Sequence, residues 1–477
     1  MEKRRIASHR ARLNRLRAVI LLVALAFVAT PLLAPVFGQS RALKTPDCRI
    51  DAVDYQGWHA LQISNRWVQL IVVPQNGGRV MQITFAGHAY LFVNPKFAGK
   101  YFPPNSGQWF NYGGDKLWLL PEGNNDEQHW AGNSDVLDDG PFTVRKVYEG
   151  DRCGVELTSL SDPQTGIQFT RTIHLDADSP RIAFHAVMKN VTGHTVEWSM
   201  QSVSQYDTSI PGEQGPNRAA QMNRDFWTFT PTNRSSSYLN RYHVRFGPAE
   251  NPAVQIRDDD LFTVHYVHMA AELWLDSREG WLAVVDRKSL YAMVERFQYQ
   301  EGKPYPGNAS VIFWTNGPEV KLNSQGNPEI SADPDASPYY LEAEINSPMC
   351  RLRPGETCTL ETEWFPTRSG TEFYGVTDAG ILIRPLRATM MANGKISLST
   401  SFGAFYAGHL VVRLYDEHGH LAAVTRVSDV TPNEEVALET EIPSQGKCSR
   451  LSLHLIDDNG IDRGALQEVQ LSGQDTH

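Results

Sequence analysis

Hydrophobic and polar residues alternate with a period of two along almost the whole chain beyond residue 48. Clear examples are the short runs at 67–73, 167–173 and 281–285. Successive side chains of a β-strand point to opposite faces, so this alternation predicts strands that bury one face. Gly, Pro, Asn and Asp separate the runs, as turns require, and no long stretch after the N-terminal segment has the period of a helix. The pattern therefore predicts an all-β protein.

The chain is long enough for two structural domains. Its 477 residues exceed the usual size of a single hydrophobic core. More than 300 residues of strand-like sequence precede a short polar linker at 366–370, which suits a large sandwich better than a small barrel. The last hundred or so residues show about seven short strands, the size of an immunoglobulin-like β-sandwich. We predict a main domain at 48–366 and a C-terminal β-sandwich at 371–477.

The N-terminus has the composition of a targeting segment. Seven Lys and Arg residues precede an uncharged run at 18–38. Residues 1–38 are therefore predicted to be a signal peptide, which would make the protein periplasmic or extracellular. The run is also about as long as a membrane span, so an uncleaved N-terminal membrane anchor is the alternative. Pro31 and Pro35 interrupt a spanning helix and favour cleavage.

The net charge of the chain limits the kinds of partner that it can bind. Loss of residues 1–38 removes seven cationic side chains and Glu2, which changes the formal net charge from −10 to −16. Such an acidic chain argues against nucleic acid and against an anionic membrane surface as partners. A membrane contact is expected only if the N-terminal segment stays uncleaved.

The five cysteines have no metal-ligand spacing, so we predict no structural zinc. Cys350 and Cys358 flank the turn at Pro354 and Gly355 and could face each other across a hairpin. In an oxidising compartment they would form a disulfide, and otherwise they would be two buried thiols. We predict that they lie close enough to bridge.

Four motifs stand out between residues 50 and 366. They are the strand pair at 65–80 with its Gly77-Gly78 turn, the segment 111–118 followed by Pro121-Glu122, the segment 305–316, and the hairpin at 339–364. Together they resemble the galactose mutarotase-like (aldose 1-epimerase-like) superfamily, and the second and third resemble an uncharacterised branch of it, a domain of unknown function. The resemblance implies a β-supersandwich with a sugar-binding cleft, and the 11 Trp and 17 Tyr suit sugar recognition as well as core packing.

The hairpin at 339–364 contains the first candidate for chemistry. An apolar strand points Glu342 to one face, and Glu344, two residues on, shares that face. The resemblance implies that the Glu of a Leu-Glu-x-Gln/Glu strand is the catalytic base of sugar ring opening. Either Glu342 or Glu344 could take this role. The alternative is a solvated pair of strand carboxylates.

Ring opening also needs an acid on the opposite side of the sugar. The resemblance implies a His in the strand after 189–192, but this chain has Gln201 or a neighbour there. Glutamine can hydrogen-bond a sugar hydroxyl but cannot protonate an oxygen. His129, in a polar loop, is the candidate acid in its place.

The Gly-Gly-Asp-Lys-Leu-Trp segment supplies further candidates for sugar binding. Asp115 and Lys116 could hold vicinal hydroxyls, and Trp118 could stack on a pyranose ring. The alternative is a turn with an Asp–Lys surface pair and a core Trp. Arg79, after the Gly-Gly turn, could bind a carboxylated sugar.

Three functional hypotheses follow. The first is an exported carbohydrate-binding protein with a mutarotase-like cleft and without ordinary mutarotase turnover. The alternative is an aldose epimerase or other sugar-acting enzyme with Glu342 as general base; a structural module of the cell envelope with a vestigial cleft is a third possibility. Neither of the first two needs a cofactor or metal. In both we expect Glu342 to open into the largest polar cleft of the main domain, with Lys116 or Arg79 nearby.

Overall fold

The computed structural model describes residues 48–104, 109–123, 128–130, 136–210, 221–318, 320–322, 328–330, 338–444 and 448–471. The predicted signal segment, residues 1–38, lies outside these ranges. No helix within the described ranges is long and apolar enough to span a membrane.

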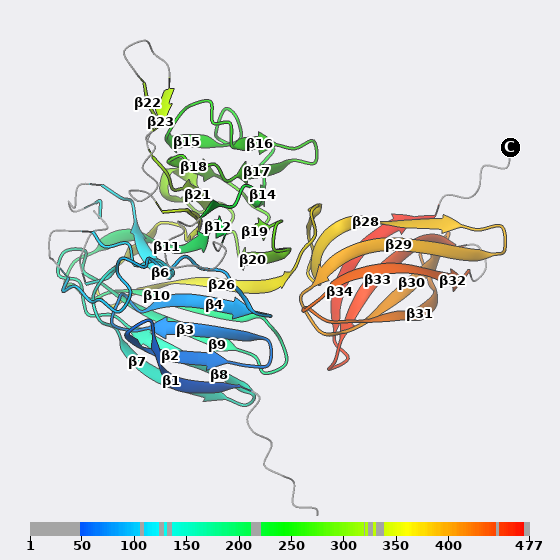
Figure 1. The fold of residues 1–477 in the computed structure, drawn as a ribbon, viewed down its shortest axis with the longest axis horizontal. Helices are drawn as coiled ribbons and strands as arrows, with labels where there is room; N and C mark the ends of the chain where they lie inside the picture. Colours follow the sequence, from blue (N-terminus) through cyan, green and yellow to red (C-terminus); the bar gives the residue numbers. More distant parts are fainter. Residues whose placement is uncertain are drawn as a thin grey trace, which may run out of the picture. The chain divides into compact units, whose positions relative to one another are not determined.

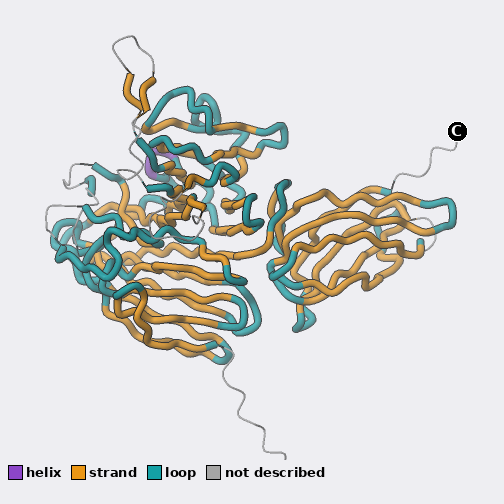
Figure 2. The backbone as a smooth tube through the Cα atoms, viewed as in Figure 1, coloured by secondary structure: helices purple, strands orange, loops and turns teal. Residues whose placement is uncertain are grey.

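Almost every regular element of the described residues is a β-strand. The exception is one short 3-10 helix, η1 (Pro306–Asn308), and Figure 2 shows how strands dominate the backbone. The all-β prediction is confirmed. The physical basis is the alternation noted above, which gives nearly every strand one face that can be buried.

Two large sheets form the first part of the fold (Figure 1). Within the described residues the first sheet has 12 strands and the second has 10. The first sheet runs in the order β1 (Arg49–Tyr55), β2 (Trp58–Ser64), β3 (Val68–Val73), β4 (Arg79–Phe85), β6 (Asp115–Leu120), β11 (Val196–Asp207), β24 (Tyr340–Asn346), β21 (Val311–Thr315), β18 (Ala271–Leu275) and β15 (His243–Phe246), with β5 (His88–Ala89) paired to β4 and β25 (Cys350–Leu352) paired to β11.

The second sheet packs against the first. Its order is β16 (Val254–Ile256), β17 (Leu261–His265), β14 (Phe226–Pro231), β19 (Trp281–Asp286), β20 (Tyr291–Phe297), β26 (Thr357–Arg368), β10 (Ile182–Asn190), β9 (Ile167–Leu175), β8 (Arg152–Thr158) and β7 (Thr143–Glu149). One hydrophobic core contains side chains from both sheets, such as Leu70, Leu341 and Ile345 from the first and Phe169 and Trp364 from the second. The arrangement is the predicted two-layer sandwich.

Two short hairpins lie apart from the large sheets. They are β12 (Ser209–Ile210) with β13 (Gln221–Met222), and β22 (Val320–Leu322) with β23 (Pro328–Ile330).

The C-terminal part forms a smaller sandwich of two four-stranded sheets among the described residues. One sheet has the order β27 (Gly375–Val376), β28 (Gly380–Met390), β29 (Lys395–Ala404) and β32 (Glu435–Pro443), and the other has β31 (Leu421–Val430), β30 (Gly408–Asp416), β33 (Cys448–Asp457) and β34 (Asp462–Gln470). A separate apolar cluster fills the space between them. The predicted small β-sandwich is therefore present, with eight strands where the sequence indicated about seven.

A further buried cluster joins the C-terminal sandwich to the second large sheet. Phe365, Phe373 and Phe405 pack in this cluster, and the Thr367 hydroxyl donates a hydrogen bond to the Ala404 carbonyl at 2.9 Å. Residues 46–477 accordingly form one compact unit. The division at 366–371 into two domains stays a prediction.

Candidate functional site

Strand alternation creates a chemically distinct outer face at the centre of the 12-stranded sheet. On β24, Leu341, Ala343 and Ile345 are buried in the core between the sheets, so Glu342 and Glu344 point the other way. The neighbouring strands β6, β11, β21 and β18 show the same alternation. Five adjacent strands therefore present polar and aromatic side chains on one surface.

The pairing register arranges these side chains in two rows. The first row crosses four strands as Gln205, Glu342, Trp314 and Glu272. The second crosses five strands as Lys116, Val203, Glu344, Ile312 and Trp274. Neighbouring strands in a sheet are about 4.8 Å apart, so residues next to each other in a row are in side-chain contact range.

A cleft of about 400 Å³ lies over these rows. Four carboxylates line it, namely Glu122, Glu272, Glu342 and Glu344. The size is at the lower end of the range for small-molecule sites.

Aromatic side chains form much of the remaining wall. They are Trp109, Trp118, Trp274, Trp314 and Tyr340. Trp118 is held in place by an edge-to-face contact with Trp130, with ring centres 4.7 Å apart, and its indole N–H donates to Glu122 Oε1 at 2.8 Å. Flat apolar rings beside charged hydrogen-bonding groups are the combination that binds a polar ring.

Glu342 and Glu344 are electrostatically linked. Gln205 Nε2 donates to Glu342 Oε1 at 2.5 Å, and Gln201 donates to Glu344. Burial raises the pKa of Glu342, and the nearby Lys116 ammonium opposes this. Burial also raises the pKa of Glu344 well above its usual range, and repulsion by the Glu342 and Glu272 carboxylates adds to that shift. Of the two groups, Glu344 therefore keeps its proton more readily than Glu342.

The other two carboxylates have raised pKa values as well. Desolvation raises the pKa of Glu272 to about 6, although the indole N–H of Trp274 donates to its Oε1 at 2.5 Å and stabilises the anion. Desolvation in the cleft also raises the pKa of Glu122. A carboxyl group that keeps its proton near neutral pH can act as a general acid.

Lys116 reaches the cleft from β6 and is anchored from behind. Its Nζ lies 3.1 Å from Asp138 Oδ1 and 3.6 Å from the ring centre of Trp118. Asp138 also accepts from Arg79 Nη2 at 2.6 Å, and Asp139 Oδ1 lies 3.9 Å from the same nitrogen. Desolvation lowers the pKa of Lys116, while Asp138 and Glu342 counteract this.

Two glycine turns make this arrangement possible. Gly77 has φ +65°, and a Cβ there would overlap the carbonyl oxygen of Asp138. Its N–H donates to Gly140 O at 2.9 Å, which brings the loop carrying Asp138 against β4. Gly113 has φ +91°, and a Cβ there would overlap the carbonyl oxygen of Phe92. Both positions therefore need glycine for close backbone approach, as the Gly-Gly motifs suggested.

Five of the predicted site residues come together in the cleft, namely Glu342, Glu344, Lys116, Trp118 and Gln201. They come from three adjacent strands, β24, β6 and β11. Their roles in binding or catalysis stay predictions, but their common location follows from the register.

Three predicted residues do not line the cleft as the structure describes it. Asp115 is fully buried on the opposite face of β6, where it pairs with Arg171 Nη2 at 2.6 Å between the two sheets. Arg79 is fully buried behind Lys116, so it supports Asp138 and has no surface for a sugar carboxylate. His129 packs against Gly123, outside the residues that line the cleft. A direct sugar contact is therefore ruled out for Asp115 and Arg79 by their burial, whereas the acid role of His129 stays a prediction.

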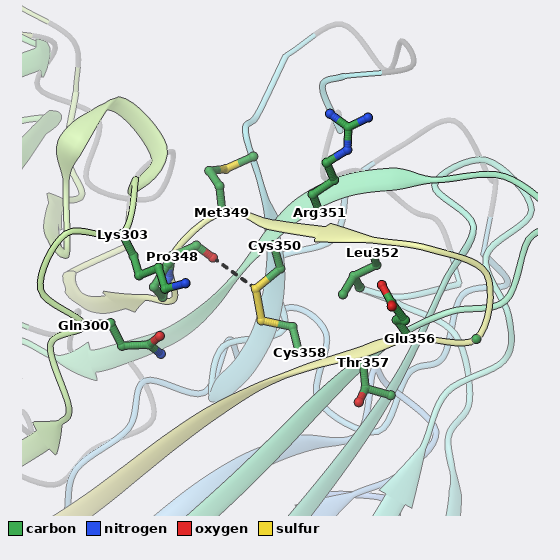
Figure 3. Close-up of a pocket in the computed structure, with 11 residues that line it drawn as sticks. Gln300, Lys303, Pro348, Met349, Cys350, Arg351, Leu352, Glu356, Thr357 and Cys358 are labelled. Atoms are coloured by element: carbon green, nitrogen blue, oxygen red, sulfur yellow. Dashed lines mark hydrogen bonds between the residues drawn. A yellow bond between two sulfur atoms is a disulfide. The ribbon is translucent and has the colours of Figure 1, made fainter.

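Glu342 opens into this polar cleft with Lys116 beside it, as expected. A second depression, of about 580 Å³, lies beside the turn that joins β25 to β26, and Figure 3 shows its lining residues around Cys350 and Cys358. These two cysteines form a disulfide with a Cα separation of 6.3 Å, so the predicted bridge is confirmed. Cys48 and Cys153 form a second disulfide, with a Cα separation of 5.6 Å, that the sequence analysis missed.

Sequence reasoning also missed several lining residues from distant segments. Glu272 and Trp274 alternate with buried apolar residues on β18, in the same pattern as Glu342 and Glu344. This alternation of acidic and aromatic residues on one strand face was a usable signal. Arg245 on β15 had no such signal, and Glu122 belonged to the second motif but was given no role. Among the described residues, no three His, Cys, Asp or Glu side chains converge as ligands of one metal ion would.

No protein-family model matches the chain, and no curated protein matches it. Solved structures do align with it at low identity. A galactose mutarotase-like protein from Clostridium acetobutylicum is 11% identical, with 68% of this chain and 100% of that chain covered and a TM-score of 0.43. A galactose mutarotase-like protein from Lactobacillus casei is 10% identical, with 64% and 99% covered and a TM-score of 0.40.

A TPR-domain containing protein from Parabacteroides distasonis is 15% identical, with a TM-score of 0.43. That alignment covers 65% of this chain but only 47% of the other, so this chain spans less than half the length of that protein.

Proposed function

We propose that the protein is an exported carbohydrate-binding protein whose ligand occupies the cleft above β6, β11, β24, β21 and β18. The observation that supports this most directly is the wall of the cleft, where five aromatic rings surround four carboxyl groups, Lys116 and Arg245. Aromatic rings bind the apolar face of a pyranose, and carboxyl groups and cations bind its hydroxyls.

Gln201 supports binding without ordinary mutarotase turnover. It occupies the strand where the sequence resemblance implies an acidic His, and its side-chain amide donates to Glu344. An amide cannot deliver a proton to a ring oxygen. Loss of a general acid costs about 10²- to 10⁴-fold in rate.

Binding is tested by titrating the purified protein with a panel of mono- and oligosaccharides, followed by calorimetry and tryptophan fluorescence. Trp109 is 47% exposed, so Trp109→Ala should leave the fold intact. We expect this variant to weaken binding by about 2- to 13-fold, the equivalent of 0.5–1.5 kcal/mol for one aromatic contact. Tyr148→Ala is the matched control, because Tyr148 is 59% exposed on β7, outside the cleft. If no sugar binds, or if both variants bind as the wild type does, the proposal fails.

A second candidate function is a sugar-acting enzyme with Glu342 as general base. The observation in its favour is the row Glu342, Trp314, Glu272, in which a second carboxyl group with a pKa of about 6 lies two strands away on the same face. Glu272 could thus supply the proton that Gln201 cannot.

Polarimetry of freshly dissolved α-glucose and α-galactose distinguishes the two functions. A pure binding protein leaves the spontaneous rate of anomerisation unchanged. Rapid equilibration by the wild type that is lost in both Glu342→Gln and Glu272→Gln would establish the enzyme. Its rate should fall as pH rises through about 6, because Glu272 then loses the proton it must donate.

A further inference from the structure

The cleft contains more carboxyl groups than its own cations can neutralise. Lys116 is paired with Asp138 at 3.1 Å, and Asp138 and Asp139 also balance Arg79. These four buried groups carry two formal charges of each sign, so Asp138 and Glu342 share the single charge of Lys116. Among the cleft-lining residues described, Arg245 is the other cation, so even with Glu344 protonated the carboxyl groups Glu122, Glu272 and Glu342 outnumber the cations.

The register places two of these glutamates on either side of an aromatic ring. Glu272, Trp314 and Glu342 occupy consecutive positions of one row across β18, β21 and β24. Two strand spacings separate the Cα atoms of the glutamates by about 9.6 Å. Their side chains can therefore converge on a small group that lies above the Trp314 ring.

A cation suits this position better than a neutral or anionic group. An ammonium group has three donors, enough for a carboxylate on each side, and its charge is attracted by the face of an aromatic ring. The aromatic rings of the cleft already face cations of the protein, since Lys116 Nζ lies 3.6 Å from the Trp118 ring centre and Arg245 Cζ lies 6.0 Å from that of Trp274. A sugar carboxylate or phosphate would add a like charge to the cleft and be repelled.

We propose that the carbohydrate ligand is a protonated amino sugar, whose ammonium group binds between Glu342 and Glu272 above Trp314. This rests on the proposed carbohydrate-binding function and specifies the substrate class of the same cleft. The raised pKa values of the cleft glutamates agree with it, because a bound cation would stabilise carboxylates that desolvation, and then mutual repulsion, destabilise.

The test compares three trisaccharides with the same β-1,4 linkage, made of glucosamine, of N-acetylglucosamine or of glucose. Binding is measured by calorimetry at pH 6 in low salt. Because a hydrogen bond to a charged group contributes more than about 1.4 kcal/mol, the glucosamine trimer should bind at least about tenfold more tightly than the other two. Added NaCl should reduce this advantage.

Charge variants give the second readout. Glu272→Gln should abolish the preference for the glucosamine trimer, whereas Arg245→Gln, which removes the opposing cation from an exposed position, should increase it about threefold or more. Glu468→Gln in the C-terminal sandwich is the control and should change nothing. If Glu272→Gln does not fold, Arg245→Gln still tests the inference.

Each outcome is decisive. If the glucose or N-acetylglucosamine trimer binds as tightly as the glucosamine trimer, the amino-sugar inference is overturned while the carbohydrate-binding proposal stands. If none of the trimers and no sugar of the wider panel binds, both are overturned.

Discussion

Replacing Asp138 tests most directly how the buried ion pairs beside the cleft stabilise the fold. Asp138 is fully buried and accepts from both Arg79 Nη2, at 2.6 Å, and Lys116 Nζ, at 3.1 Å. Asp138→Asn keeps the shape of the side chain but removes one of the two negative charges that lie beside the buried cations Arg79 and Lys116. Removing one partner of a buried ion pair typically costs about 3–5 kcal/mol. We expect the free energy of unfolding to fall by an amount in this range. The loss should not exceed it, because Asp139 remains 3.9 Å from Arg79.

The assay is urea unfolding followed by tryptophan fluorescence, with the midpoint compared at unchanged slope. Asp259→Asn is the control, because the Arg257–Asp259 pair at 2.8 Å is partly exposed and such pairs contribute only about 0–1 kcal/mol. The double variant Asp138→Asn with Lys116→Met should be more stable than Asp138→Asn alone, because one uncompensated cation is gone.

Two results would refute this reasoning. One is a midpoint for Asp138→Asn as close to the wild type as that of Asp259→Asn. The other is a double variant less stable than Asp138→Asn alone. That result would mean that the contact of Lys116 with the Trp118 ring stabilises the fold by more than the unpaired charge of Lys116 destabilises it.

The remaining predictions concern stability. Burial raises the pKa of Glu295 to about 8, so the folded state binds a proton more tightly than the unfolded state does. The free energy of unfolding should therefore fall as pH rises from about 4.3 to 8. Glu295→Gln should flatten this pH dependence in a series of urea unfolding experiments, and an unchanged slope would contradict the prediction. The Cys48–Cys153 bridge closes a loop of 105 residues and the Cys350–Cys358 bridge closes a loop of 8. Loop-closure entropy therefore predicts that replacing each pair by Ala lowers the free energy of unfolding by about 4.8 and about 2.5 kcal/mol, respectively. Equal losses would show that strain or residual structure dominates.

Local sequence features determined a substantial part of this protein. Period-two alternation is a property of neighbouring residues, so it was sufficient to predict strands, the all-β class and the shared face of Glu342 and Glu344. The Cys350–Cys358 bridge was predictable because the two residues flank one short turn. The hairpin expected around that turn was wrong, because β24 and β25 pair within the first sheet whereas β26 pairs within the second. The Gly-Gly motifs likewise signalled close backbone approach, which Gly77 and Gly113 provide.

Tertiary structure alone decided which face of each strand became the cleft. Alternation placed Asp115 and Lys116 on opposite faces of β6 but could not tell which face would be covered by the second sheet. Glu272 and Glu342 are 70 positions apart in the sequence, and they share a row because β21 pairs with both of their strands. The burial of Arg79 against Asp138 and the Cys48–Cys153 bridge depend in the same way on distant segments meeting. The free energy that selects such contacts comes from packing whole sheets together, and no single segment of the sequence contains that information.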